Sequence, residues 1–280
     1  MYNFFAKKNI IITGATSGIG ERLSQMLSKY NSNLLLVSKS KEKLQIVKNN
    51  INNKSSKIEI FDTDLSKKDS AQKIYDFSLN HFDCIDIIIN NAGIGYNSFV
   101  TAINKDIAKE VFEINFFTIV DINKLFLPSM IKKNQGSIVN ISSWGGKRSI
   151  PGSSIYCASK FALEAYAESL RCELKSTNIN VLTVRPSFIY DSNFLNGKFM
   201  KETPDVNLEK RIKKFNKMSS NIVAKKILIS LVKKSRDLNL TLITKLLIIL
   251  NSIIPGIIDI LIFKMRKKDI ISNLKKIQDN

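Results

Sequence analysis

The chain has 280 residues, near the upper size for one hydrophobic core, so its length favours one domain with an extension. Its three scattered cysteines exclude a disulfide framework and fit a reducing compartment, and a single histidine without paired cysteines predicts no metal site. With 43 basic and 24 acidic residues, the net charge of +19 would attract a polyanion, either nucleic acid or an anionic membrane surface.

The N-terminus predicts a strand, a glycine-rich turn and a helix. Asn9–Thr13 is predicted to be a short buried strand, and the following helix is expected to extend to about Lys29. Glycines let a backbone approach a pyrophosphate closely, and a helix N-terminus offers free N–H groups to its charge. The residues predicted to hold these phosphates are Gly14, Thr16, Ser17, Gly18, Ile19 and Gly20. The spacing is Gly-x-x-x-Gly-x-Gly, so this segment alone leaves an ordinary turn equally open.

Further short apolar runs recur along the chain, with helical stretches between them. Such runs suit parallel strands that are covered on both faces. They are Asn33–Val37, Lys57–Phe61, Ile85–Ile89, Ser137–Ile141, Asn180–Val184 and Leu238–Leu242. The pattern predicts an α/β fold: one doubly wound, Rossmann-type parallel sheet with helices on both faces. We expect residues 1–242 to form this α/β domain and residues 243–280 a helical extension. Met1–Lys8 has no long apolar region and predicts no signal peptide.

The end of the second predicted strand bears on the choice of dinucleotide. An acidic residue there would accept hydrogen bonds from the ribose hydroxyls of NAD and repel a 2′-phosphate. The segment Val37–Lys41 contains no carboxylate, and Lys39, helped by Ser38, Ser40 or Lys41, is the predicted clamp for a 2′-phosphate. We therefore expect NADP(H) to be preferred over NAD(H). The alternative is that these lysines only solvate the start of the next helix.

Three residues in the centre of the chain predict carbonyl chemistry. Tyr156 and Lys160 are one helical turn apart, and Ser143 precedes the tyrosine by thirteen residues. A phenol has an ordinary pKa of about 10, and we expect the neighbouring ammonium to lower the pKa of Tyr156. A serine hydroxyl aimed at the same oxygen would polarise a carbonyl. The set predicts a catalyst that lacks only a hydride donor.

Neighbouring residues leave alternatives open. Ser142 could be the catalytic hydroxyl, although the interval to Tyr156 favours Ser143. Trp144 either packs on a substrate or merely covers the sheet. Asn115 lies in an apolar helical run, where a buried amide needs hydrogen-bond partners, and this favours a functional role.

Together these motifs resemble the short-chain dehydrogenase/reductase family from Lys7 to Lys234. The segments that carry the resemblance are Thr13-Gly14-x-x-x-Gly18-Ile19-Gly20, Asp64-Leu65, Asn90-Asn91-Ala92-Gly93 and the tetrad Asn115, Ser143, Tyr156 and Lys160. The resemblance implies an NAD(P)-dependent oxidoreductase in which Lys160 also holds the nicotinamide ribose and Asn115 positions a water of a proton relay. It also implies cofactor contacts at Asp64, Leu65, Asn91, Ala92, Gly93, Pro186 and Ile189.

One segment departs from the family pattern. Where the family usually has Pro-Gly-x-Val-x-Thr, this chain has Pro186-Ser187-Phe188-Ile189-Tyr190-Asp191. Ser187 restricts the backbone freedom that glycine would give, and Asp191 brings a negative charge, although it could accept a hydrogen bond from the nicotinamide carboxamide. The resemblance also implies that residues 188–219 form a long loop over the substrate.

The last third of the chain is both basic and apolar. Residues 195–280 contain nineteen Lys or Arg and seven Asp or Glu, while Leu246–Ile258 carries no charge. This uncharged run is shorter than the roughly 20 residues that span a bilayer, and Pro255-Gly256 interrupts it. We expect two short helices, Ile243–Ser252 and Pro255–Lys268, lying in a membrane interface. The cations expected to face the headgroups are Lys245, Lys264, Arg266, Lys267 and Lys268.

The alternative for these helices is that they cover the substrate cleft or a dimer partner. Because no nucleic-acid motif accompanies the charge, no nucleic-acid partner is expected. The sequence thus predicts a cytoplasmic homo-oligomer, peripheral at the cytoplasmic membrane face, that interconverts a ketone and a secondary alcohol on a lipophilic small molecule. The competing function is a membrane-associated, cofactor-binding sensor or scaffold with little turnover.

Overall fold

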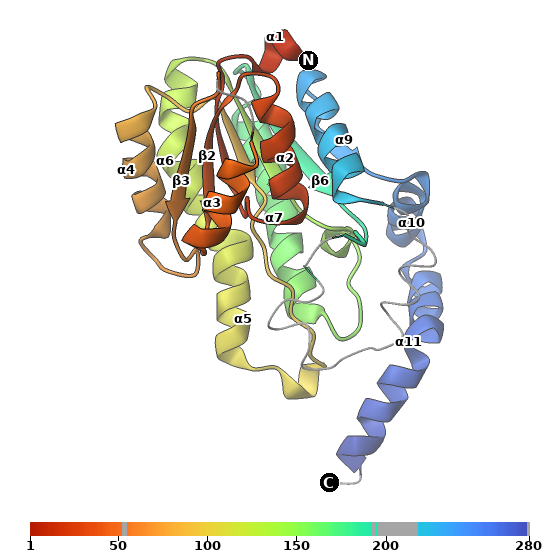
Figure 1. Cartoon of the computed structure of the whole chain (residues 1–280). Coiled ribbons are helices and arrows are strands. Elements are labelled where there is room, and N and C mark those ends of the chain that lie inside the picture. Colours follow the sequence, from red (N-terminus) through yellow and green to blue (C-terminus); the bar gives the residue numbers. More distant parts are fainter. Residues whose placement is uncertain (52–54, 192–193, 195–217, 279–280) are drawn as a thin grey trace.

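The computed structural model describes residues 1–51, 55–191, 194 and 218–278 (Figure 1). Seven parallel strands form one sheet in the order β3-β2-β1-β4-β5-β6-β7. The strands are β1 Asn9–Thr13, β2 Asn33–Ser38, β3 Ile58–Asp62, β4 Ile87–Asn90, β5 Gly136–Ile141, β6 Ile179–Arg185 and β7 Asp237–Asn239. The strand order reverses between β1 and β4, and open sheets of this kind bind ligands at the carboxyl ends of the strands beside that point.

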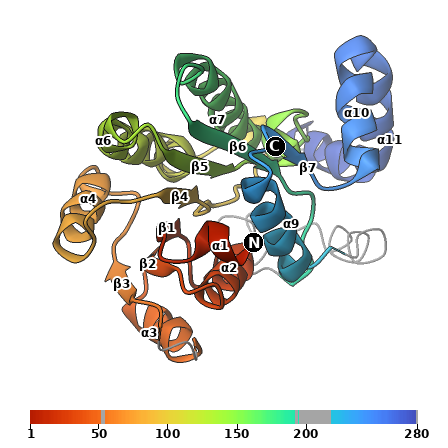
Figure 2. The same cartoon turned by 90° about the horizontal axis from the view of Figure 1, so that it is seen from above.

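Helices cover both faces of the sheet, as predicted (Figure 2). On one face lie α2 Gly18–Ser28, α3 Lys41–Asn49 and α9 Ser220–Val232. On the other lie α4 Ser70–His81, α6 Thr118–Lys132 and α7 Ser154–Glu173. The other α-helices of the described residues are α1 Tyr2–Phe5, α5 Lys105–Phe112, α10 Leu242–Ile253 and α11 Pro255–Gln278.

The sheet is apolar on both faces because successive strand residues point to opposite sides. Ile10 and Ile12 pack into the core under α2 and α9, whereas Ile11 packs into the core under α4, α6 and α7. All three side chains are fully buried. The continuous apolar runs in the sequence therefore did predict a doubly covered parallel sheet.

Two predicted strand boundaries are wrong by two residues or more, and the others lie within one residue of the observed ends. In the run from Ile85, the strand begins only at Ile87. Asp86 is held by other contacts, because its carboxylate accepts a hydrogen bond from the backbone N–H of Asn9 (2.9 Å) and forms an ion pair with Lys8 (3.2 Å). The last strand ends at Asn239, and not at residue 242, because the hydroxyl of Thr241 accepts from the backbone N–H of Thr244 and starts α10.

The helical segment Lys105–Lys132 is long and apolar enough to cross a membrane by length and composition, and almost half of its most apolar part is buried within the protein. It comprises α5, a π-helical turn at Glu113–Phe117 and α6. Ile122 and Phe126 of α6 are buried in the core of the domain. This segment is accordingly a core helix of the α/β domain.

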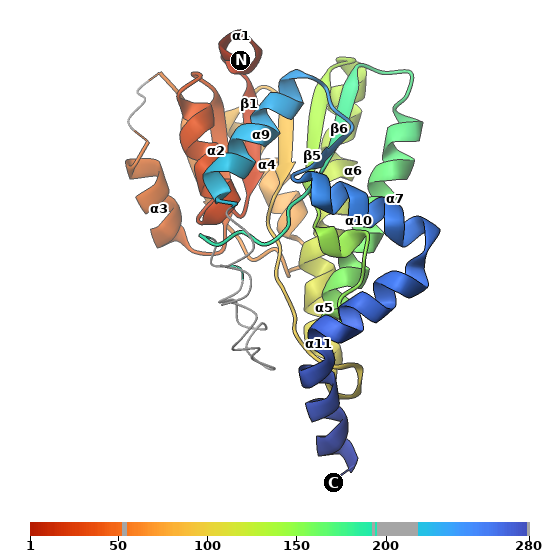
Figure 3. The same ribbon diagram turned by 90° about the vertical axis from the view of Figure 1, so that its right-hand side faces the viewer.

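The two C-terminal helices are attached to the domain beside α7 and β7 (Figures 1 and 3). Arg148 donates to Asn251 of α10 (3.0 Å) and forms an ion pair with Asp259 of α11. Pro255 does separate two helices, as predicted, but α11 continues to Gln278, ten residues beyond the predicted end. Ile258 and Ile262 are buried against the domain.

Candidate active site

A cavity of about 640 Å³ lies at the carboxyl ends of the central strands. It brings together nearly all the residues predicted for the cofactor and for catalysis. Those that line it are Gly14, Thr16, Ser17, Gly18, Ile19, Ser38, Lys39, Asp64, Leu65, Asn91, Ala92, Gly93, Ser143, Tyr156, Lys160, Pro186 and Ile189. Gly20 and Asn115 lie behind this lining.

The glycine-rich turn has the backbone shape that its glycines suggest. Gly14 and Gly18 have φ angles of +66° and +54°, in the left-handed region that favours glycine. A Cβ at Gly20 would lie 2.3 Å from the Gly14 carbonyl oxygen, so Gly20 permits close packing of α2 on the turn. Ser17 is the N-cap residue of α2, and its side chain makes no hydrogen bond to the helix. The backbone N–H groups of the first turn are therefore not capped by this side chain, and Ser17, Gly18 and Ile19 all line the cavity.

Thr13 and Asn91 join β1 to β4 beside this turn. The Thr13 hydroxyl accepts hydrogen bonds from the backbone N–H groups of Asn91 and Ala92, both at 3.0 Å. The Asn91 side chain donates to the carbonyls of Thr13 (2.9 Å) and Gly14 (3.1 Å). These contacts hold the glycine-rich turn at a fixed distance from the segment after β4.

Lys39 has a carboxylate partner that the sequence did not reveal. Its ammonium lies 2.6 Å from Asp64 Oδ2, while the Lys39 side chain is 75% exposed. Burial alone would raise the pKa of Asp64, but hydrogen bonds from Lys39 and Ser66 lower it to about 2. Ser38 instead shares a hydrogen bond with Thr16 (2.9 Å). An acidic group is therefore present beside the end of β2, supplied by the segment after β3.

Tyr156 and Ser143 form a hydrogen-bonded pair in the cavity. Burial raises the pKa of the Tyr156 hydroxyl well above its usual value, and the hydrogen bond with the Ser143 side chain opposes this rise. Ser143 Oγ also accepts from the backbone N–H of Gly145 (3.0 Å). The Phe194 ring lies 5.5 Å from the Tyr156 ring, between centroids. The phenol is thus a protonated group in an apolar wall.

Lys160 was predicted to lower the pKa of Tyr156, but burial raises this pKa, and the opposing contact is the hydrogen bond with Ser143. Lys160 Nζ donates to the carbonyl of Ile141 at 2.9 Å. Burial also lowers the pKa of Lys160 to about 8, opposed by the negative charge of Glu164. The lysine therefore titrates near neutral pH, in the range useful for proton transfer.

Asn115 lies in the π-helical turn between α5 and α6. Its amide accepts from the backbone N–H of Ile94 (2.8 Å) and donates to the Ile94 carbonyl (2.9 Å) and to Ser159 (3.0 Å). A Cβ at Gly93 would lie 3.1 Å from Asn115 Oδ1 and 3.4 Å from Lys160 Nζ, so the amide and the ammonium flank the same glycine. A π-helical turn at such a position is typical of functional sites.

The segment after β6 explains part of the departure from the family pattern. The Pro186 carbonyl accepts from the backbone N–H of Trp144 (3.0 Å), and Pro186, Ser187, Phe188 and Ile189 line the cavity. Asp191 does not line it. Its carboxylate accepts from the backbone N–H (2.7 Å) and the hydroxyl (2.9 Å) of Ser220 at the start of α9, so it holds a helix end and not a carboxamide. Most of the predicted loop 188–219 lies outside the described residues.

The cavity also has walls outside the predicted site residues, and those from α11 agree with the alternative that the C-terminal helices cover the cleft. Tyr96 and Asn97 come from the segment after β4, and Ile262, Met265 and Arg266 come from α11. Ile262 and Arg266 are four residues apart on one helix face, which is the signal that could have placed them together. Arg266, expected to face headgroups, is instead turned towards Gly152, and its side chain is only 13% exposed.

Within the part of the chain that the structure describes, His, Cys, Asp and Glu form no group that could hold a metal ion. The functional groups that the site offers are hydroxyl, ammonium and amide groups, and they lie beside a glycine-rich turn of the kind that binds dinucleotides. A carbonyl oxygen placed between Ser143 and Tyr156 would meet one hydrogen-bond donor and one proton donor.

Comparison with known proteins agrees with this geometry. Residues 8–202 match the family model of the short chain dehydrogenases. A mouse protein named dehydrogenase/reductase SDR family member 7B is 29% identical over 253 residues, 89% of this chain and 78% of its own length. A Xenopus laevis protein of the same name is 34% identical over 194 residues, 67% of this chain and 60% of its own length.

Solved structures show the same fold. A Sphingobium yanoikuyae short-chain dehydrogenase in complex with NADPH has a TM-score of 0.75 and 22% identity, and the match covers 90% of this chain and 95% of that one. A Burkholderia phymatum short-chain dehydrogenase/reductase in complex with NAD has a TM-score of 0.74 and 22% identity, covering 84% and 89%. With the family model matching well over half of its residues, the chain belongs to the short-chain dehydrogenase/reductase family of oxidoreductases.

Proposed function

We propose that this protein is an NADP(H)-dependent oxidoreductase that interconverts a ketone and a secondary alcohol on a lipophilic substrate. One observation carries the proposal: a single cavity contains Ser143, Tyr156 and Lys160 together with the glycine-rich turn. The left-handed φ angles of Gly14 and Gly18 and the open first turn of α2 fit a dinucleotide phosphate. NADP(H) bound there would supply the hydride.

In the direction of reduction, each catalytic side chain has one task. Ser143 would donate a hydrogen bond to the substrate carbonyl and so stabilise the charge that develops on its oxygen. Tyr156, which burial keeps protonated, would deliver the proton to that oxygen. Lys160 would hold the ribose and supply positive charge beside the phenol, and Asn115 would orient the segment through the backbone of Ile94.

A purified-protein screen tests this function directly. NADPH absorbance would be followed with ketones and aldehydes of graded chain length. Turnover should rise with chain length if the cavity takes a lipophilic substrate. Tight NADPH binding without turnover on any carbonyl compound would favour the sensor or scaffold function. The observation that supports this alternative is the departure of Pro186–Asp191 from the family pattern.

The NADP(H) preference rests on Lys39 and its neighbours. Lys39, Ser38 and Thr16 line one end of the cavity, but Asp64 partly neutralises the lysine. Solved relatives are described with NAD in one case and NADPH in another. We infer that Lys39, which is largely exposed, turns from Asp64 to a 2′-phosphate when the cofactor binds.

Lys39→Asp should weaken NADPH binding by roughly tenfold to a hundredfold, because a charge-assisted hydrogen bond contributes about 1.5–3 kcal/mol. NADH binding should improve or remain unchanged. Isothermal titration calorimetry with both cofactors gives the measurement. Lys43→Asp, at an exposed position of α3, is the matched charge control and should bind NADPH normally. Unchanged NADPH affinity in Lys39→Asp, or a parent protein that prefers NADH, contradicts the assignment.

The C-terminal helices support attachment to a membrane surface. Large apolar side chains are exposed along both helices: Leu246, Ile249, Leu250, Ile253, Ile254, Ile257, Ile260, Leu261, Phe263, Met265, Ile271 and Leu274. Exposed lysines accompany them at Lys245, Lys264, Lys267, Lys268 and Lys275. Apolar insertion combined with cationic attraction is the pattern of an interfacial helix. Because α11 also lines the cavity, we infer that a lipophilic substrate enters from the lipid side.

The variant Ile253→Asp/Ile260→Asp should lower the binding of the protein to anionic liposomes by roughly tenfold or more, because each buried isoleucine contributes about 1.5–3 kcal/mol. These side chains are 70% and 56% exposed, so the fold and NADPH affinity should survive. Ile46→Asp, at a 58% exposed position of α3, is the control. High salt should weaken binding of the parent without abolishing it. If the double variant, the control and the parent all sediment equally with vesicles, the exposed apolar side chains of α10 and α11 are not the membrane-binding surface.

We also infer a homo-oligomer that resides in the cytoplasm at the inner face of a membrane. The exposed apolar side chains of Phe117, Ile131 and Phe161 on the α6 and α7 side support a contact between subunits.

A further inference from the structure

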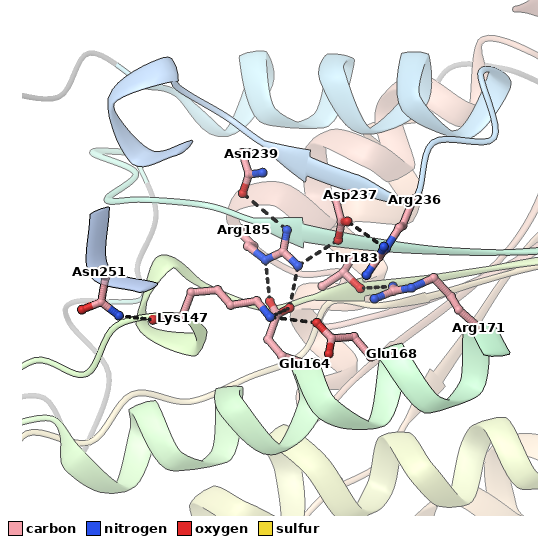
Figure 4. A network of polar contacts seen from close by, with 10 residues as sticks. All are labelled: Lys147, Glu164, Glu168, Arg171, Thr183, Arg185, Arg236, Asp237, Asn239 and Asn251. Atoms are coloured by element: carbon pink, nitrogen blue, oxygen red, sulfur yellow. Dashed lines mark hydrogen bonds and ion pairs between the residues drawn. The ribbon is translucent and has the colours of Figure 1, made fainter. Parts of the chain in front are cut away.

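A buried carboxylate, Glu164, lies one helical turn beyond Lys160 on α7. Figure 4 shows its contacts with Lys147 and Arg185. Its side chain is 3% exposed. It accepts two hydrogen bonds from Arg185, from Nε to Oε1 at 2.9 Å and from Nη2 to Oε2 at 2.7 Å. Lys147 Nζ lies 3.5 Å from Glu164 Oε2. One carboxylate therefore joins two cations that come from different segments of the chain.

Both segments form part of the cavity wall. Arg185 is the last residue of β6 and directly precedes Pro186, and Lys147 directly follows the short turn Trp144–Gly146 after Ser143. The two segments also touch each other, because the backbone N–H of Trp144 donates to the Pro186 carbonyl.

The turn after Ser143 packs against α7 without free space. A Cβ at Gly146 would lie 3.0 Å from the carbonyl oxygen of Lys160 and 3.1 Å from Glu164 Cγ. A displacement of the Glu164 side chain must therefore also displace the turn. Lys147 provides the second connection, since its side chain reaches α7 while its carbonyl accepts from Asn251 of α10 (3.4 Å).

Each cation has a second carboxylate partner farther out. Asp237 of β7 accepts from Arg185 (2.8 Å), and Glu168 of α7 accepts from Lys147 (2.9 Å). Neither Asp237 nor Glu168 lines the cavity. Glu164 alone among these three carboxylates contacts both cations, so it alone joins both active-site segments to the helix of Tyr156 and Lys160. Glu168, which is also on α7, holds only the Lys147 segment.

We propose that Glu164 is a positioning residue: through Lys147 and Arg185 it holds the Ser143 turn and the Pro186 segment in register with Tyr156 and Lys160. Its effect on turnover rests on the proposed carbonyl-reductase function, whereas its effect on the turn does not. The two effects can be measured separately, because Trp144 is the only tryptophan and lies in the turn itself.

The first measurement is acrylamide quenching of Trp144 fluorescence in the whole protein, with its melting temperature recorded alongside. Glu164→Gln should raise the quenching constant roughly twofold, because the turn loses the buried one of its two ionic contacts with α7. Lys147→Met, at a partly exposed position, removes only the link to the turn and should give the same change with little loss of thermal stability. Asp237→Asn, which removes only an outer partner of Arg185, should quench like the parent. Glu168→Gln leaves the contact of Glu164 with both cations in place and should raise the quenching constant less than Glu164→Gln does.

The second measurement is steady-state kinetics with the carbonyl compound that the parent reduces fastest in the screen. Glu164→Gln and Lys147→Met should lower kcat by about tenfold to a hundredfold, because small misplacements of catalytic groups cost this much. The dissociation constant of NADPH should change only a few-fold. Glu164→Asp should recover part of the rate.

Two outcomes overturn the proposal. One is parent-like quenching and kcat in both Glu164→Gln and Lys147→Met. The other is an equal loss of kcat in Asp237→Asn at a matched melting temperature, which would make the network merely structural. If the parent reduces no carbonyl compound at all, the proposed function fails, and the fluorescence comparison still decides whether Glu164 positions the turn.

Discussion

Tyr156→Phe should lower kcat for carbonyl reduction by about 10²- to 10⁴-fold, the range that general acid catalysis contributes. The substitution removes the transferable proton and keeps the ring, so the contact with Phe194 should persist. NADPH affinity should stay within a few-fold of the parent value. Rapid-quench or steady-state rates, together with calorimetric titration of NADPH, give the two quantities.

The same helix provides a matched control. Tyr166 accepts a hydrogen bond from Asn123 (3.3 Å) and does not line the cavity. Tyr166→Phe therefore removes a hydroxyl from α7 and should leave kcat unchanged. Ser143→Ala should reduce kcat less completely than Tyr156→Phe, because the phenol can still bind the substrate oxygen. A parent-like rate in Tyr156→Phe with any substrate that the parent reduces would refute the mechanism.

Lys160→Met should damage both cofactor binding and turnover, since one ammonium serves the ribose and the phenol. We expect kcat/KM to fall by about 10²-fold or more, within the range of a lost acid-base group. Lys226→Met is the matched control, because Lys226 also donates to a backbone carbonyl, that of Leu240 at 2.9 Å, but lies on α9 away from the cavity. If Lys160→Met loses turnover but keeps the NADPH affinity of the parent, Lys160 does not bind the ribose.

The pH dependence of the parent follows from the same lysine. Burial lowers the pKa of Lys160 to about 8, so the ammonium is present below this pH and is lost as the pH rises through it. Burial raises the pKa of Tyr156, so the phenol remains a proton donor over the same range. The kcat/KM for reduction, which reports the free enzyme, should therefore be flat at lower pH and decline above about pH 8. Lys160→Met should lack this decline.

The sequence predicted the sheet well because its strands are buried on both faces. Ile10, Ile11 and Ile12 must each pack somewhere, and a run without alternation leaves only a doubly covered strand. Boundaries were harder. Strand ends depend on single polar contacts, such as the one between Asp86 and Asn9, and apolar periodicity does not encode them.

The candidate site was predictable where function depends on spacing along one helix or turn. Tyr156 and Lys160 share a helix, and the glycines follow one another in a single turn. Contacts between distant segments were not predictable. Lys39 pairs with Asp64 across two strand ends, and Asp191 turns to Ser220 at the start of a helix. The raised pKa of Tyr156 has the same origin, since burial is a property of the assembled fold.

The wall that α11 gives to the cavity affects how such a protein can diverge. Ile262, Met265 and Arg266 come after the last strand, whereas the catalytic and dinucleotide-binding side chains all come before it. Genetic exchange of the segment downstream of β7 would therefore replace part of the substrate wall in one step and leave the redox machinery intact. Changes after β7 can thus alter the cavity wall without altering any catalytic or dinucleotide-binding side chain.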